Sequence, residues 1–300
     1  MNEASTVQST TNVNKQPGAY LALGVAIIAL GISPVLVRLA DAPGPVTSFY
    51  RLLIGVLVMT IPFLREVRKR GPLPRAGVWV AIGGGLFFAL DMASWSTGVM
   101  LGNATNPTLL ANTAPLWVGF GTMLFFRERL SGRFWLGLLV ALTGAALVLG
   151  VTSESIRQLD MGSLFGLLAG IFYGSYFLFV QRGRETLSAL SFFWIAAAST
   201  TVTLLVVVLL LGQPLGGYRA QSWLLFVVMG VFVQAGGYYA ITYAQGHLPA
   251  ALVSPTLLGQ PVVTAIVAGI FLGERFTPLH ILGGIAVLAG VLVVHSSRRP

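Results

Sequence analysis

The stretch APLWVGFGTMLFFRERLSGRFWLGLLVALTGAALVLG, residues 114–150, decides the fold because a short charged turn interrupts a long apolar run. A helix needs about 20 mostly apolar residues to cross a bilayer core about 30 Å thick. Apolar segments of this kind cover 104–126 and 134–151, on either side of Arg127-Glu128-Arg129. The stretch therefore predicts two membrane-spanning helices with a short connection.

The rest of the chain continues this pattern. Hydrophobic residues make up 55% of it and charged residues only 9%, whereas a soluble domain carries roughly 25% charged residues. We predict an all-α integral membrane protein with ten spans, at Gly18–Val37, Val46–Leu64, Ala76–Met100, Ala104–Phe126, Phe134–Val151, Gly162–Val180, Leu190–Leu211, Trp223–Ala244, Ala250–Leu272 and Leu279–Val294. The connections are too short to form a separate soluble domain.

The opening stretch has a second copy 146 residues further on, QPVVTAIVAGIFLGERFTPLHILGGIAVLAGVLVVHS at 260–296. Matched positions include Pro115 with Pro261, Glu128-Arg129 with Glu274-Arg275, Leu136 with Leu282, Gly137 with Gly283, Leu142 with Leu288, and Gly144 with Gly290. A repeat of five spans is odd in number, so its second copy enters the membrane from the opposite side. The sequence therefore predicts two inverted five-helix repeats around a central cavity, an arrangement that many secondary transporters use for alternating access.

The predicted organisation has five parts. They are a disordered cytoplasmic tail at 1–17, a first repeat at 18–151, a linker at 152–161, a second repeat at 162–296 and a cytoplasmic tail at 297–300. With the N-terminus inside, thirteen of the 18 Lys and Arg residues fall in inside segments and four in outside loops. Cytoplasmic loops are enriched in these residues, so we predict that both termini are cytoplasmic.

Two ionisable residues lie inside predicted spans, Arg51 in the second and Asp91 in the third. Charge at membrane depth is costly and marks a functional candidate. Both fall toward the outer third of the bilayer, where they could pair. One interpretation is a structural ion pair, or an arginine that reaches the outer interface. The other makes Asp91 a proton carrier or a contact for a substrate ammonium group.

Further polar and aromatic residues share helical faces. Gly84, Phe88, Asp91, Trp95 and Gly98 follow helical spacing on the third span, and Gln234, Tyr238, Ile241 and Gln245 follow it on the eighth. The predicted cavity residues are Asp91, Trp95, Phe88, Asn112, Tyr173, Tyr176, Gln234, Tyr238 and Gln260. Packing or interface anchoring is the alternative role for the aromatic residues.

A second group is predicted to be structural or gating: Arg51, Pro115, Pro261, Glu128, Arg129, Glu274 and Arg275. A proline frees a backbone carbonyl and distorts its helix. The Glu-Arg pairs are expected to cap helix ends or join helices rather than to contact solute. Gly137, Ala141, Gly144, Gly283 and Gly290 indicate close helix packing.

The chain offers poor signals for enzyme chemistry. It contains no cysteine, and its three histidines have no metal-ligand spacing. There is no nucleophile-elbow motif and no P-loop. We therefore predict no catalytic residue, no metal and no cofactor.

The twice-occurring pattern of a proline-containing helix, a Glu-Arg turn and a glycine-spaced helix resembles the paired EamA domains of the drug/metabolite transporter superfamily. The resemblance covers nearly the whole chain from about residue 18. Within that superfamily the chain is most similar to bacterial amino-acid exporters of the YddG type. The resemblance implies a basket of ten helices whose cavity is lined by helices 1, 3, 4, 6, 8 and 9, with helices 5 and 10 at its edge.

These observations predict a secondary transporter of small metabolites in the bacterial inner membrane. The resemblance favours export of amino acids, with aromatic or hydrophobic ones preferred. The expected partners are the solute and the lipid bilayer, without nucleic acid, for a monomer or weak oligomer. A passive facilitator or channel and an intramembrane enzyme are the alternatives.

Overall fold

The computed structural model describes residues 16–101, 105–151, 160–273 and 277–297, and every regular element in them is a helix. The first half contains α1 (Pro17–Leu39), α2 (Gly44–Arg70), α3 (Arg75–Leu101), α4 (Thr105–Ala111), α5 (Ala114–Phe125) and α6 (Gly132–Val148). The second half contains α8 (Met161–Gly183), α9 (Ala189–Leu210), α10 (Ala220–Val228), the π-helix η2 (Met229–Tyr238), α11 (Tyr239–Gln245), α12 (Ala250–Thr256), the 3₁₀-helix η3 (Leu257–Gly259), α13 (Gln260–Leu272) and α14 (Pro278–Ser296). Nearly all of both predicted tails, most of the predicted linker, Glu274 and Arg275 lie outside the described residues.

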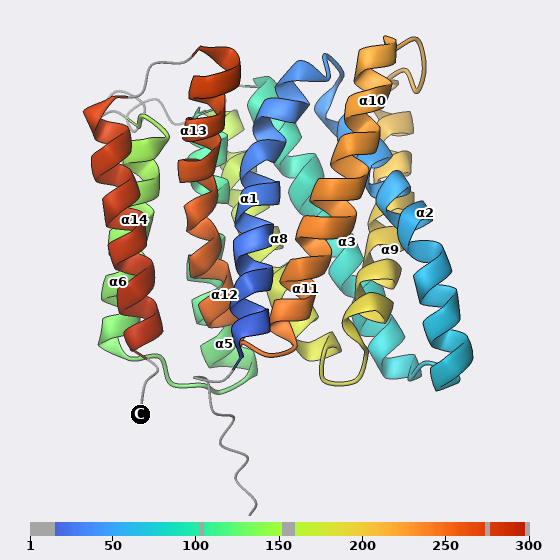
Figure 1. The fold of residues 1–300 in the computed structure, drawn as a ribbon, viewed down its shortest axis with the longest axis horizontal. Coiled ribbons are helices and arrows are strands. Elements are labelled where there is room, and N and C mark those ends of the chain that lie inside the picture. Colours follow the sequence, from blue (N-terminus) through green and yellow to red (C-terminus); the bar gives the residue numbers. More distant parts are fainter. Residues whose placement is uncertain (1–15, 102–104, 152–159, 274–276, 298–300) are drawn as a thin grey trace, which may run out of the picture.

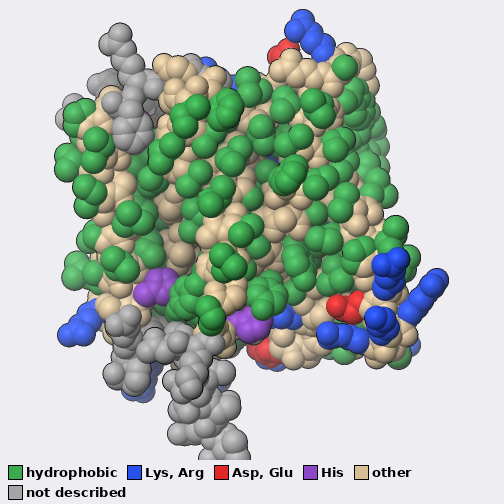
Figure 2. Space-filling model, in the orientation of Figure 1, with side chains coloured by type: hydrophobic (Ala, Val, Ile, Leu, Met, Phe, Trp, Pro, Cys, Tyr) green, Lys and Arg blue, Asp and Glu red, His purple; other side chains and the backbone are tan. Residues whose placement is uncertain are grey.

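The surface has the distribution of a membrane protein. Nine helices or end-to-end helical stacks of the described chain are long and apolar enough to cross a membrane, and α6 is a shorter apolar helix of 17 residues. Figure 2 shows hydrophobic side chains covering the middle of the molecule and charged ones gathering at its two ends. The prediction of an all-α membrane protein is confirmed.

Two of the predicted spans are interrupted near a proline. α4 ends at Ala111 and α5 begins at Ala114, with Pro115 in its first turn. In the second half, η3 separates α12 from α13, and Pro261 lies in the first turn of α13. Proline lacks a backbone N–H and its ring crowds the preceding turn. The expected helix distortion is therefore present in both halves.

Glycines on α8 let it approach α4 and α5 closely. A β-carbon added at Gly166 would lie 2.4 Å from the Cα of Pro107, and one at Gly170 would lie 2.6 Å from the Leu110 carbonyl oxygen. Gly174 continues this row at the same four-residue spacing. Because residues four apart share a helix face, one whole face of α8 is occupied by backbone contact.

The central helix α3 packs against both α8 and α9. A β-carbon at Gly98 would lie 2.8 Å from the Gly162 carbonyl oxygen of α8, and one at Gly85 would lie 2.3 Å from the Ala196 carbonyl oxygen of α9. Figure 1 shows α3 in the interior of the bundle, with α8 beside it. The first half of the chain is thus joined to the second through direct backbone contact.

At one edge of the molecule, α6 and α14 form a pair (Figure 1). A β-carbon at Gly137 would lie 2.8 Å from the Gly290 carbonyl oxygen, and one at Gly144 would lie 2.6 Å from the Gly283 carbonyl oxygen. The earlier glycine of one helix faces the later glycine of the other, so the two helices are antiparallel. The expected close packing of these glycines is confirmed.

We predict that Gly144→Ala destabilises the protein by about 1–3 kcal/mol, because the added methyl group must push two backbones apart. The matched control is Gly132→Ala in the same helix, where an added β-carbon meets no atom within 4 Å. Thermal unfolding in a fixed detergent should show a lower midpoint for Gly144→Ala alone. Equal midpoints for the two variants would contradict the packing argument.

Candidate functional site

Four aromatic rings meet in the interior of the bundle. Phe88 of α3 has its ring centroid 4.7 Å from that of Tyr176, 4.9 Å from that of Tyr238 and 6.2 Å from that of Tyr173. Phe88, Tyr176 and Tyr238 are 5% exposed or less. Asp91 lies one turn further along α3 and interacts electrostatically with Tyr173 and Tyr238. We call Phe88, Asp91, Tyr173, Tyr176 and Tyr238 the central cluster.

The glycine contacts explain why these side chains meet. Gly166, Gly170 and Gly174 take up the face of α8 that packs on α4 and α5. Tyr173 and Tyr176 lie on the rest of α8, which packs against α3. Helical spacing then places Phe88 and Asp91 on the α3 face that the tyrosines contact. These contacts bring Phe88, Asp91 and the tyrosines together, while their role in lining a solute cavity stays a prediction.

Arg51 and Asp91 are both buried, with exposed fractions of 6% and 4%. The Arg51 guanidinium donates to the Ser33 hydroxyl at 3.2 Å and to the Met92 sulfur at 2.9 Å. These two described residues interact electrostatically, but no direct salt bridge joins them. The expected pairing of Arg51 with Asp91 is therefore not a contact ion pair, because the arginine is held by neutral groups instead.

Polar atoms without a partner lie in the same interior. Among the side chains that the structure describes, Nε of Arg51 and Oε1 of Gln234 are buried with no hydrogen-bond partner. Buried polar groups are nearly always hydrogen-bonded, and an unpaired one calls for an explanation. A polar ligand that completes these bonds would supply one.

The face expected on the eighth span is altered by η2. A π-helix bonds residue i to i+5, so residues four apart no longer lie above one another as they do in an α-helix. Gln234 packs against the position of Gly55 in α2, whereas Tyr238 contacts Phe88 of α3. Tyr238 also interacts with Arg51 of α2, so both residues have α2 as a neighbour. That Gln234, Tyr238 and Gln245 form one polar face toward a cavity therefore stays a prediction.

Other predicted residues lie around the cluster. Trp95 donates from its indole nitrogen to the Thr108 hydroxyl at 3.2 Å, and Asn112 donates to the Thr108 carbonyl at 2.8 Å. Gln260 begins α13, where its carbonyl lies close to Gly31 of α1. These contacts join α3 to α4 and, separately, α13 to α1.

The remaining predicted residues of the described chain lie at helix starts or in a connection. Pro115 and Pro261 lie in the first turns of α5 and α13. Glu128 and Arg129 lie in the connection between α5 and α6, with Arg129 exposed.

Sequence reasoning missed Ser33, Met92 and Thr108. The pattern of a polar residue beside a proline, applied to the first span, would have found Ser33, which precedes Pro34. Met92 carried no signal, because a methionine in an apolar helix is ordinary. In the described part of the chain, no group of three or more His, Cys, Asp or Glu residues could hold a metal.

Comparison with known proteins supplies the family. A model described as the EamA-like transporter family matches residues 16–150 and again residues 160–296. An "uncharacterized transporter" of Archaeoglobus fulgidus is 25% identical over 273 residues, covering 91% of this chain and 94% of the relative. The "uncharacterized transporter YdfC" of Bacillus subtilis is 25% identical and covers 81% of this chain and 79% of its own length.

A solved crystal structure shares the fold. It superposes with a TM-score of 0.77 at 19% sequence identity, and the match covers 94% of this chain and 99% of that one. Together with the double family match, the helical bundle and the apolar surface, this places the chain among multi-pass membrane transporters: it belongs to the EamA-like transporter family.

Proposed function

We propose that this protein is a secondary transporter that exports amino acids, with aromatic or bulky apolar ones preferred, by alternating access across the bacterial inner membrane. The observation that carries the proposal is the pair of buried opposite charges, Asp91 and Arg51, beside an aromatic cluster in the middle of the bundle. Neither charge has its counter-ion in direct contact. The subgroup of YddG-type exporters suggested by the sequence fits this chemistry.

The chemistry matches a zwitterion. Asp91 can accept from an ammonium group, and Arg51 can donate to a carboxylate through bonds that are stronger than those to its present neutral partners. Phe88, Tyr173 and Tyr176 offer aromatic surface beside these charges. An α-amino acid with an aromatic side chain presents all three features at once.

The helix contacts support ten spans arranged as inverted repeats. In the first half α3 packs on α8, and in the second half η2 and α11 pack on α1 in the corresponding way. Likewise, α4 and α5 pack on α8, and α13 packs on α1. The packing of α3 on α9 corresponds likewise to that of η2 on α2. In each of these three pairs, exchanging the first half of the chain with the second turns one contact into the other. The antiparallel α6–α14 pair corresponds to itself, as expected for helices beside a twofold axis in the membrane plane.

The charge distribution supports cytoplasmic termini. The start of α1 and the end of α14 lie at the same end of the molecule in Figure 1. The basic end of α2, with Arg65, Arg68, Lys69 and Arg70 all exposed, lies at that end too. Positively charged segments stay on the cytoplasmic side.

The test of function is uptake of radiolabelled amino acids into proteoliposomes, with empty liposomes as the control. We expect saturable uptake of L-phenylalanine and L-tryptophan, each competing with the other and neither displaced by L-aspartate. Accumulation that is lost when a protonophore collapses the proton gradient would support a coupled carrier. Equilibration without accumulation would favour the passive facilitator instead, and no uptake of any amino acid by folded protein would remove the amino-acid assignment.

We predict that Asp91→Asn abolishes accumulation while the protein stays folded, because the amide can neither carry a proton nor balance an ammonium group. The matched control is Asp160→Asn, since Asp160 caps the N-terminus of α8 and asparagine caps a helix equally well. Both variants are compared by proteoliposome uptake and size-exclusion chromatography. Normal accumulation by Asp91→Asn would show that Asp91 neither carries a proton nor binds the ammonium group, and only a structural role would remain.

Arg51→Lys should raise the KM for the amino acid about tenfold or more, because a charged hydrogen bond contributes about 1.5–3 kcal/mol. Lysine keeps the charge but loses the fork of donors that binds a carboxylate through two bonds. Arg65→Lys at the exposed end of α2 serves as the control. An unchanged KM in Arg51→Lys would argue against a carboxylate contact at this position.

A further inference from the structure

A second polar region lies at the basic end of the bundle, away from the central cluster. It is a cavity of about 400 Å³ between the end of α2, the α8–α9 connection and α11. Ligand pockets for small molecules start at about 300 Å³. Glu66, Arg70, Arg184, Ser188, Tyr239 and Tyr243 are among the residues that line it.

The cation of this cavity is held by neutral groups. Arg184 donates from Nε to the Thr242 carbonyl at 3.1 Å and from a terminal nitrogen to the Leu187 carbonyl. The guanidinium lies against Gly246, where an added β-carbon would be 2.1 Å from a terminal nitrogen of Arg184. Burial lowers the pKa of Arg184, although Tyr239 and Glu66 counteract the shift. An arginine stays protonated regardless, so a poorly hydrated cation faces the cavity.

Glu66, one of the two acids that line the cavity, is also held by neutral groups. Glu66 accepts hydrogen bonds from the hydroxyls of Ser188 and Ser191, the latter at 2.9 Å. It interacts with Arg184 electrostatically, but these two described residues form no direct salt bridge. Neutral partners therefore keep two opposite charges apart on the walls of one cavity.

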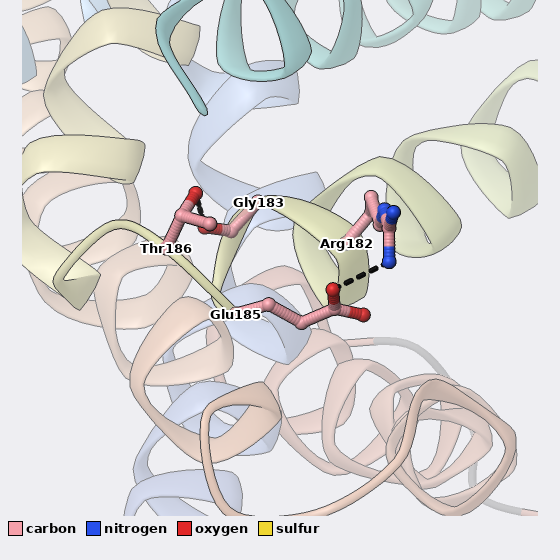
Figure 3. Close-up of polar contacts among 4 residues, drawn as sticks. All are labelled: Arg182, Gly183, Glu185 and Thr186. Carbon is pink, nitrogen blue, oxygen red and sulfur yellow. Dashed lines mark hydrogen bonds and ion pairs between the residues drawn. The ribbon is translucent and has the colours of Figure 1, made fainter. Parts of the chain in front are cut away.

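Glu185, the other acid that lines the cavity, already has a cation in contact. Figure 3 shows Glu185 turned toward Arg182, with which it forms a salt bridge of 2.5 Å on the exposed side of the α8 end. Glu185 thus has its cation in contact, whereas Glu66 does not. Tyr239 and Tyr243, four residues apart on α11, add two aromatic rings to the same cavity.

We propose that this cavity is a second binding site for a zwitterionic amino acid, with its carboxylate on Arg184 and Arg70 and its ammonium group on Glu66. A carboxylate competes well for Arg184 because charge-assisted hydrogen bonds are roughly twice as strong as neutral ones. The site lies at the end predicted to be cytoplasmic, so it receives solute before the central cluster does. The choice of ligand rests on the proposed transport of amino acids.

The absence of cysteine makes a direct test possible, since a single introduced thiol is the only one in the protein. Thr186→Cys places a thiol on the exposed lip of the cavity, and Leu190→Cys provides a second reporter on its wall. The measurement is the rate of N-ethylmaleimide labelling with and without L-phenylalanine, in the Asp91→Asn background so that the central cluster cannot respond.

We expect L-phenylalanine to slow labelling several-fold in this background. Phenethylamine and 3-phenylpropionate, which lack the carboxylate and the ammonium group respectively, should each fail to do so. Protection should be lost in Arg184→Lys and in Glu66→Gln but kept in Arg182→Lys, the matched control outside the cavity. Arg70→Gln, at the exposed end of α2, should also lose protection, and it serves as the test if the half-buried Arg184 and Glu66 variants fail to fold.

The second site is overturned if L-phenylalanine does not slow labelling in the Asp91→Asn background. It is also overturned if adding Arg184→Lys leaves the protection unchanged. Uptake of L-phenylalanine without protection would leave the transport proposal standing and remove only this site. Protection with the predicted variant pattern but without uptake would leave the second site standing and remove the transport proposal. If the protein shows no uptake and no protection, both the transport proposal and the second site are removed.

Discussion

Close contact between helix backbones is the constraint on which the rest of this structure depends. Lipid chains are as apolar as leucine side chains, so helices in a membrane associate through tight packing rather than through the hydrophobic effect. Here the row Gly166, Gly170 and Gly174 seats α8 on α4 and α5, while Gly85 and Gly98 seat α3 on α8 and α9. These contacts leave little freedom in the position of α8. Its tyrosines are thereby directed at α3, and the central cluster follows.

The charged groups beside the central cluster and in the cavity at the basic end share one property. Arg51 is held by a hydroxyl and a thioether, Arg184 by two carbonyls, and Glu66 by two serine hydroxyls. A buried charge in contact with its counter-ion gains little from a new partner. One held by neutral dipoles still gains from meeting an opposite charge. The protein thus keeps its charged groups inside without neutralising them against each other.

Sequence periodicity was enough to predict the helices, the distortion near Pro115 and Pro261, and close packing through the glycines of the fifth and tenth spans, but not that these two spans pack on each other. Each of these depends on neighbours along the chain or on a repeat within it. The sequence also placed Phe88 and Asp91 on one face, because α3 is a regular helix. It could not predict that Arg51 binds Ser33 and Met92, since this depends on how three helices meet. Nor could it show that Glu66 accepts from Ser188, which is 122 residues away.

The π-helix η2 has a mechanical consequence. Each turn that bonds i to i+5 contains an extra residue compared with an α-helical turn. Returning one such turn to α-helical form would rotate the chain beyond it by about 100° and shift it by about 1.5 Å, the step of a single residue. Gln234 packs on α2 and Tyr238 on α3, both within η2. Tyr238 also interacts with Arg51 of α2, so moving the extra residue along η2 would change the contacts of this helix with α2 and α3 together.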